Sequence, residues 1–467
     1  MGTGLLTSVE SSATFSGKTS PLWLNANKYG VSSVRGNSGY LRAAIQKPSV
    51  ADVRSDWRLG YGLDLVFAYD FTSPVVVQQL YADIDYKKVR LSVGSKERLP
   101  NLKDPELSSG SQTLGINARP VPEVRFEIPD YLPLTKAGWF AIRGHLGYGM
   151  MTDASWQKDY VGSSGKYAQN VLYHSKSGFL RIGNEHKFPL VFEGGIEMAG
   201  LFGGVAHVDG TRIDMGHSLK SFGAILVGAG HDPTDGQYPN AEGDIVGSWL
   251  FSLSYKLDDW KFRAYYDHFF EDHSAMFFEY GWNDGLLGLE VTMPRNAIAD
   301  KFVYEYVTTE EQSGPIYHDG TPELPTQISA RDNYYNHLIY NGWQHWGQPI
   351  GNPLFTSPLY NPDRTLRFLN NRFTAHHFGL SGTPVPALHY RILLSFSRNL
   401  GIYDRPFEDV FHNASFLTEV SFRPNKIGRW DSRGWSLSGA FALDRGRLMG
   451  DNTGFQLTLR KQGSLNF

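Results

Sequence analysis

Gly454–Phe467 reads GFQLTLRKQGSLNF, and this stretch decides the fold. Apolar or small residues occupy every second position on one side, with Lys461 as the exception, and polar residues occupy the other side. A period of two predicts a β-strand with one apolar face and one wet face. The run exceeds the usual length of a globular strand and suits a tilted strand that crosses a bilayer.

The apolar face of this stretch ends in Gly463, Leu465 and Phe467. These residues look like the terminal signal that outer-membrane barrels present to their insertion machinery, so we expect them to act as an assembly signal. A single strand of this kind would also fit the edge of a β-sandwich. The prediction therefore depends on whether the rest of the chain repeats the pattern.

The composition narrows the class of protein. The 467 residues include no Cys and 14% aromatics, and the mean hydropathy is -0.33. No apolar run approaches the roughly 20 residues that a spanning helix needs, which excludes a helical membrane protein. The net charge of -3 indicates no nucleic-acid partner. Met1–Val9 lacks the basic and apolar regions of a signal peptide, so we expect a mature chain.

The alternation of the last stretch recurs along the chain. Leu5–Gly17 alternates and is expected to pair with Gly454–Phe467, which would close the sheet and leave no edge. In Trp57–Asp70, aromatics flank an aliphatic middle on one face. Tyr167–Gly183 is expected to form one long strand with a bulge near Lys176–Gly178. The alternation predicts these lumen-facing charges: Asp64, Asp83, Asp85, Arg90, Arg143, Lys261 and Arg263.

The connections between the alternating runs support a membrane barrel. Counting gives about 18 strands, with short even-numbered connections and mostly long odd-numbered ones. Periplasmic turns and extracellular loops differ in length in this way, whereas a soluble sandwich or propeller gives no reason for it. The expected extracellular loops are 18–38, 97–120, 151–166, 200–245, 268–285, 309–371 and 398–412.

We therefore predict an all-β protein, a single closed antiparallel transmembrane β-barrel domain over residues 1–467. Such a barrel lies in the bacterial outer membrane and contacts outer-membrane lipid. The pattern indicates no particular oligomeric state.

Several loop segments resemble one family when taken together and in order. They read PLWLNANKYG at 21–30, NSGYLRA at 37–43, LSSGSQTLGINARP at 107–120, IPDY at 128–131, FEDHSAMFFEYGWNDGLLG at 270–288, EYVTTEEQSGPIYHD at 305–319 and YNGWQHWGQPIGNPL at 340–354. The chain thus resembles the Wzi capsule-assembly family in its Bacteroidetes-type form, essentially from end to end. That resemblance implies an outer-membrane barrel that tethers capsular polysaccharide like a lectin and is not an enzyme. Because this sequence begins directly with a strand, the loops are left to close the lumen.

The longest loop, 309–371, has the composition of a carbohydrate site. Sugars need flat apolar faces and polar partners, and Arg adds affinity for the carboxylates of uronic acids. The alternative is that the aromatics pack a folded loop inside the barrel mouth. The candidate polysaccharide-binding residues are Trp343, Trp346, His345, Tyr340, Tyr335 and Arg331, with Arg119 and Trp23 from two other loops.

Other clusters of polar residues give weaker evidence of a functional site. The acidic cluster in loop 268–285 consists of Glu271, Asp272, His273, Glu279 and Asp284. It has no spacing such as DxDxDG that would indicate calcium, and nothing further supports hydrolysis of a glycan by paired carboxylates. Ser108–Ser111 does not match the GxSxG of serine hydrolases. We predict no catalytic residue, no metal and no cofactor.

The sequence thus predicts an outer-membrane protein that binds and tethers surface polysaccharide. The alternative is a substrate-specific porin or diffusion channel. A barrel of this size conducts water unless something fills it. The two functions are therefore distinguished by whether loops 97–120 and 309–371 fold inward.

Overall fold

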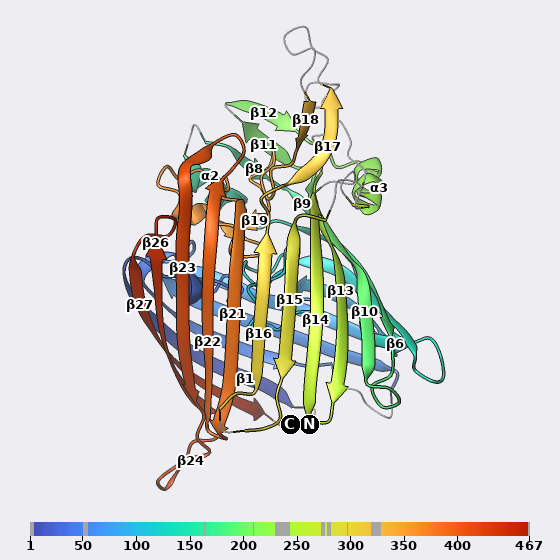
Figure 1. Cartoon of the computed structure of the whole chain (residues 1–467), viewed down its shortest axis with the longest axis vertical. Helices are drawn as coiled ribbons and strands as arrows, with labels where there is room; N and C mark the ends of the chain where they lie inside the picture. Colours follow the sequence, from blue (N-terminus) through green and yellow to red (C-terminus); the bar gives the residue numbers. More distant parts are fainter. Residues whose placement is uncertain are drawn as a thin grey trace.

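The computed structural model describes residues 4–49, 55–162, 165–208, 210–228, 243–271, 276–277, 282–296, 298–318 and 328–465. An 18-stranded antiparallel sheet closes on itself (Figure 1). Its strands, in wall order, are β1 (Leu5–Thr19), β2 (Arg35–Lys47), β3 (Trp57–Tyr69), β4 (Val75–Tyr86), β5 (Val89–Ser95), β6 (Glu123–Pro133), β7 (Phe140–Met150), β9 (Leu172–Ile182), β10 (Leu190–Phe202), β13 (Asp244–Leu257), β14 (Trp260–Glu271), β15 (Gly285–Thr292), β16 (Lys301–Thr308), β21 (Arg372–Val385), β22 (Leu388–Gly401), β23 (Pro406–Phe422), β26 (Trp435–Gly446) and β27 (Asn452–Leu465). The predicted closed all-β barrel is confirmed.

Shorter elements lie in the connections. The helices are α1 (Leu22–Asn25), α2 (Ala154–Val161), α3 (Leu219–Val227) and the 3-10 helix η2 (Pro358–Tyr360). The short strands are β8 (Tyr167–Gln169), β11 (Val205–Val208), β12 (Thr211–Asp214), β17 (Ser313–His318), β18 (Ile328–Arg331), β19 (Gln344–His345), β20 (Gln348–Pro349), β24 (Lys426–Ile427) and β25 (Trp430–Asp431). Among the described residues, no helix has the length and apolar character that a membrane span requires.

The first and last strands of the wall close the barrel. β1 pairs with β2 on one side and with β27 on the other, in a register that runs from Leu5 opposite Leu465 to Ser16 opposite Gly454. This is the pairing that the alternation of the two stretches predicts. Every wall strand thus has two neighbours, and no edge is left to expose unpaired backbone groups to lipid.

The alternation of side chains sorts the two faces of the wall. On β3, Leu63 is 39% exposed on the outside, whereas the neighbouring Asp64 is 1% exposed inside the barrel. The outward side chains of the wall are large and apolar, which is the surface that lipid requires. The closed barrel with its apolar outer surface confirms the outer membrane as its location.

The two ends of the barrel differ. Both chain termini and the short turns lie at the lower end in Figure 1, and the long connections lie at the upper end. Two of the short turns place Lys87 (φ 54°) and Asp258 (φ 51°) in the left-handed region, as tight hairpins of right-twisted strands require. The lower end is therefore the periplasmic end, and the upper end is the extracellular end.

One predicted strand is divided in two. Asn170 adopts φ 55° and separates β8 from β9, so Tyr167–Gly183 is not a single strand. β8 leaves the wall and pairs with β11 above the barrel. The predicted bulge near Lys176–Gly178 is wrong, because β9 keeps a continuous register with both β7 and β10.

Inward-folded connections fill the lumen, and the one that carries α1 adds Trp23 and Leu24 to their shared apolar core. Residues 97–120 and 332–371, which we call the plug, bring Leu107, Tyr335, Trp343 and Phe355 into one apolar core. The same core includes lumen-side residues of the wall such as Val307 on β16. The loops therefore fold inward, and the barrel is not an open pore.

Candidate functional site

The first segment of the plug is fixed to the wall by carboxylates on the lumen side. Glu305 of β16 accepts hydrogen bonds from Ser108 Oγ (2.6 Å) and Ser109 N (2.7 Å) and from the phenol of Tyr265 (2.6 Å). Lys103 forms a buried ion pair with Asp267 of β14 (2.5 Å). Buried charges are stable only when they are paired and hydrogen-bonded in this way, so the segment has a single defined position.

The second segment of the plug is fixed to the first. Trp343 donates from its indole Nε1 to the carbonyl of Thr113 (2.8 Å), and the phenol of Tyr335 donates to the carbonyl of Gln112. The same phenol oxygen accepts from the backbone N–H of Asn352 (3.0 Å). Because both segments share these buried contacts, the plug behaves as one packed unit.

Most of the predicted polysaccharide-binding residues belong to this packed core. Trp343 is 0% exposed and stacks on Tyr173 of the wall, so it offers no face to a sugar. The same holds for Tyr335, Tyr340, His345 and Trp23, which are all buried. These five candidate polysaccharide-binding residues offer no free ring face here, and the alternative that the aromatics pack a folded loop describes them. Arg331 lies in β18, and its side chain is outside the described part of the chain.

Trp346 and Arg119 differ from the other candidates. The Arg119 guanidinium lies 4.4 Å from the centre of the Trp346 ring. Trp346 sits in the turn between β19 and β20 with φ 56°, held by a hydrogen bond from its N–H to Asp153 (2.9 Å). Its ring is partly exposed and lies beside Trp156 of α2, with ring centroids 5.8 Å apart. Of the predicted residues, the structure brings these two together at the wall of a cavity.

That cavity opens at the extracellular rim. It has a volume of about 380 Å³, and we call it the outer vestibule. Its rim carries the exposed side chains of Lys18, Arg35 and Arg364, and its floor carries Arg119 and Trp346. The vestibule is bounded by the ends of β1, β2 and β3 and by the plug.

Two further cavities continue inward along the same side of the barrel. The inner cavity of about 100 Å³ shares Arg119 with the outer vestibule. The lower cavity of about 340 Å³ shares Tyr29, Lys96 and Leu99 with the inner cavity. Ser8, near the periplasmic end of β1, lines the lower cavity. The three cavities thus follow one another from the extracellular rim towards the periplasmic half.

Most of the predicted lumen charges form ion pairs. Asp64 binds Arg42 (2.5 Å), Asp83 binds Lys96 (2.5 Å) and Asp85 binds Arg90 (2.7 Å). Arg263 binds Glu290, and Lys261 binds Glu185 (3.0 Å) at the periplasmic end. The Arg143 guanidinium lies 4.9 Å from the centres of the Tyr131 and Phe179 rings. Asp64 and Lys96 also line the lower cavity, so paired charges form part of its surface.

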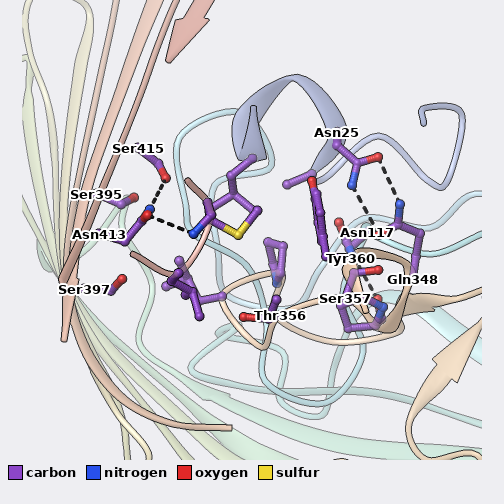
Figure 2. A pocket seen from close by; sticks show the side chains of 17 residues that line it. Asn25, Asn117, Gln348, Thr356, Ser357, Tyr360, Ser395, Ser397, Asn413 and Ser415 are labelled. Atoms are coloured by element: carbon purple, nitrogen blue, oxygen red, sulfur yellow. Dashed lines mark hydrogen bonds between the residues drawn. The ribbon is translucent and has the colours of Figure 1, made fainter. Parts of the chain in front are cut away.

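Next to the outer vestibule, with which it shares Gln348 and Tyr360, the plug meets the wall at a much smaller space. Figure 2 shows Asn25 hydrogen-bonded to Gln348 (3.0 Å), facing Ser395 and Asn413 of β22 and β23. The space has about 20 Å³, enough for one or two waters but not for a solute. The polar residues in Figure 2 therefore line a contact between plug and wall rather than a binding site.

The acidic cluster of the sequence is only partly described. Asp272, His273 and Glu279 lie outside the described residues, whereas Glu271 and Asp284 are buried. Asp284 accepts from the backbone N–H groups of Glu311 (3.2 Å) and Gln312 (2.5 Å), and burial raises its pKa to about 6. Within the described ranges, no group of three or more His, Asp or Glu side chains has a geometry that would hold a metal ion.

Sequence reasoning missed Trp156, Tyr160 and Arg364, which line the outer vestibule. Trp156 and Tyr160 are four residues apart, a helical spacing that places both rings on one face of α2, with centroids 5.0 Å apart. That spacing is a signal that was present in the sequence. Arg364 has no comparable signal, because its position depends on how the plug folds.

Comparison with known proteins gives structural likeness only. No family model matches the chain, and no curated protein matches it. The solved structures that resemble it include OpdL of Pseudomonas aeruginosa, with 9% identity, coverage of 99% of both chains and a TM-score of 0.50. OccK5 (OpdH) of Pseudomonas aeruginosa has 9% identity, 99% coverage of both chains and a TM-score of 0.49. A BenF-like porin from Pseudomonas fluorescens has 8% identity, covers 99% of this chain and 98% of its own, and has a TM-score of 0.47.

These findings correct two expectations. The chain shares its fold with OpdL, and no family model matches it, so the assignment to the Wzi capsule-assembly family is wrong. The predicted tethering of surface polysaccharide rested on that family and on the aromatic residues of loop 309–371, most of which are buried, and it is wrong as well. At 9% identity the likeness to OpdL shows the fold alone.

Proposed function

We propose that the protein is a substrate-specific, non-enzymatic channel of the outer membrane. The observation that carries the proposal is the succession of three cavities from the extracellular rim to the lower lumen, each sharing at least one lining residue with the next. A protein that tethers polysaccharide needs a binding site at the surface, but it does not need cavities that continue into the lumen. A selective channel needs a filled barrel with one lined route.

The fixed plug supports a route through these cavities rather than around a moving loop. The hydrogen bonds of Glu305 and the ion pair of Lys103 are buried, and breaking such contacts costs several kcal/mol, on the order of 3–5 for a buried ion pair. A solute would therefore pass the side chains that separate the cavities, of which Arg119 is the first.

In this proposal, the predicted residues that line a cavity contact the solute. Arg119 and Trp346 would contact the solute in the outer vestibule, and Asp64, which is paired with Arg42, would line its path below. The terminal residues Gly463, Leu465 and Phe467 would direct insertion by the outer-membrane machinery. Leu465 supports this role because its side chain is exposed on the outside of β27.

Electrical recording from the purified protein in a planar bilayer tests the proposal. We expect discrete steps of steady conductance, smaller than those of an unplugged barrel of the same strand number, because the inner cavity of about 100 Å³ limits the current. The same protein unfolded before addition serves as the control. A folded preparation that inserts into the bilayer and gives no steps would overturn the proposal.

A further inference from the structure

The outer vestibule has an excess of positive charge. Lys18, Arg35, Arg119 and Arg364 line it, against the single carboxylate of Asp70. Asp70 lies 4.0 Å from Arg35, and both side chains are largely in water, so this pair is weak. The volume of about 380 Å³ falls within the range of small-molecule sites, about 300–1,000 Å³. The charge of the lining favours a small anion.

Arg119 is the cation that such an anion would reach last. Its side chain is 7% exposed, and its Nη2 donates to Thr72 Oγ1 (2.7 Å). Within the described part of the chain no carboxylate bonds it directly, and the more distant charge of Asp153 is the carboxylate that acts on it, which leaves few partners for a buried guanidinium. An anion at the floor of the vestibule would supply the missing partner, with the planar geometry that guanidinium matches.

Glycine at position 30 lets Arg119 adopt this position. Gly30 has φ 69°, and a Cβ there would lie 2.6 Å from Arg119 Cγ. The Arg119 stem therefore packs directly on the backbone of the loop that follows α1, and its head lies over the Trp346 ring. The arrangement holds the guanidinium at the junction of the two cavities.

A row of aromatic rings leads to Arg119 from the rim. Tyr160 stacks on Trp156, with ring centroids 5.0 Å apart, and Trp156 lies beside Trp346 at 5.8 Å. Flat apolar faces of this kind suit the C–H surfaces of a sugar ring. Ser32, Thr72 and Asn361 add hydroxyl and amide groups to the same lining, which suit sugar hydroxyls.

We propose that the outer vestibule binds a small sugar acid of the hexuronate class. Its carboxylate pairs with Arg119, its ring lies along Trp156 and Trp346, and its hydroxyls meet the polar groups of the lining. This inference rests on the proposed channel function and names the class of solute that the channel admits. The bound solute is a monomer, because the Arg119 side chain lies between the vestibule and the inner cavity.

Calorimetric titration of the full-length protein in detergent tests the site with three probes: sodium glucuronate, glucose and sodium benzoate. We expect saturable binding of glucuronate and at least tenfold weaker binding of the other two, because glucose lacks the charge and benzoate lacks the hydroxyls. Arg119→Gln should weaken glucuronate binding at least tenfold, and Arg119→Lys should weaken it less. Arg447→Gln serves as the matched control, because Arg447 pairs with Asp409 outside the vestibule.

Several results would overturn the site. They are no saturable binding of glucuronate, equal binding of glucose or benzoate, and a folded Arg119→Gln protein that binds like the parent. If Arg119→Gln does not give the heat-modifiable band of a folded barrel, Trp346→Ala replaces it and should weaken glucuronate binding about fivefold or more. Unchanged binding in a folded Trp346→Ala protein also counts against the site.

Conductance recorded from the same preparation separates the two proposals. Steady conductance without glucuronate binding removes the sugar-acid site and leaves the channel. Glucuronate binding without conductance removes the channel and leaves the vestibule as a binding site.

Discussion

The face on which a single wall residue lies determines how much its substitution lowers the free energy of unfolding. Leu63 is central in β3 and points to lipid, so Leu63→Arg should destabilise the barrel by about 2–4 kcal/mol. Tyr69→Arg is the matched control on the same face, because Tyr69 ends β3 and is 72% exposed near the interface. There the cost should be about 0–1 kcal/mol. Urea unfolding from liposomes measures both, and equal costs would mean that β3 does not cross the bilayer as described.

Asp284 gives the plug a dependence on pH. Burial raises its pKa to about 6, above the value of about 3.9 in an unfolded chain. The folded protein therefore binds this proton more tightly, so the contribution of Asp284 to stability is most favourable at low pH and declines as the pH rises through about 6. Hydrogen exchange at the amides of Glu311 and Gln312, corrected for intrinsic rates, should show more protection at pH 5 than at pH 7.5. Asp284→Asn should flatten this difference, and an undiminished difference in that variant would contradict the assignment.

At the scale of elements, the contact between β16 and the plug keeps the lumen filled. Glu305→Ala removes the acceptor of Ser108, Ser109 and Tyr265, and each unsatisfied buried donor costs about 1–3 kcal/mol. We expect a loosened plug and a severalfold larger steady conductance in a planar bilayer. Glu310→Ala is the control, because Glu310 pairs with Arg398 at a partly exposed position. A folded Glu305→Ala barrel with the conductance of the parent would show that this contact does not hold the plug.

The closing strand β27 is the element on which assembly depends. Leu465→Asp places a charge on its outward face, where Leu465 is paired with Leu5 of β1. We expect lower levels in the outer membrane with normal synthesis and export, and the same result from deletion of Phe467, which lies outside the described residues. Ser464→Asp, the adjacent position on the other face, should have the smaller effect. Membrane levels are read by fractionation and immunoblotting, and parental levels in all three variants would remove the assembly role.

The elements also show how far the sequence alone could be taken. The wall was predictable because a period of two is written into each strand, as in β3 and β27, and because hairpin closure needs only local order. The break at Asn170 could not be predicted, because a single residue at φ 55° leaves the alternation around it almost intact. The fold of the plug was harder to predict, because aromatics beside polar residues occur both in sugar-binding sites and in the interior of a packed loop. Trp343 and Trp346 are three residues apart, and only the folded turn between β19 and β20 decides which one meets solvent.

For the molecule as a whole, a barrel that is filled and yet lined by successive cavities is the basis of the channel proposal. The chain has no cysteine, so a single introduced thiol can report on the route. Thr72 lines the outer vestibule and accepts the hydrogen bond of Arg119. Thr211 is exposed on β12, outside the lining of the three cavities.

The most direct test is the single-channel current of Thr72→Cys before and after a bulky methanethiosulfonate reagent is added on the extracellular side, with Thr211→Cys as the matched control. A route through the outer vestibule predicts that the reagent abolishes most of the current of Thr72→Cys and leaves that of Thr211→Cys unchanged. A Thr72→Cys protein that is fully modified, as shown by mass spectrometry, and still carries its full current would contradict the account.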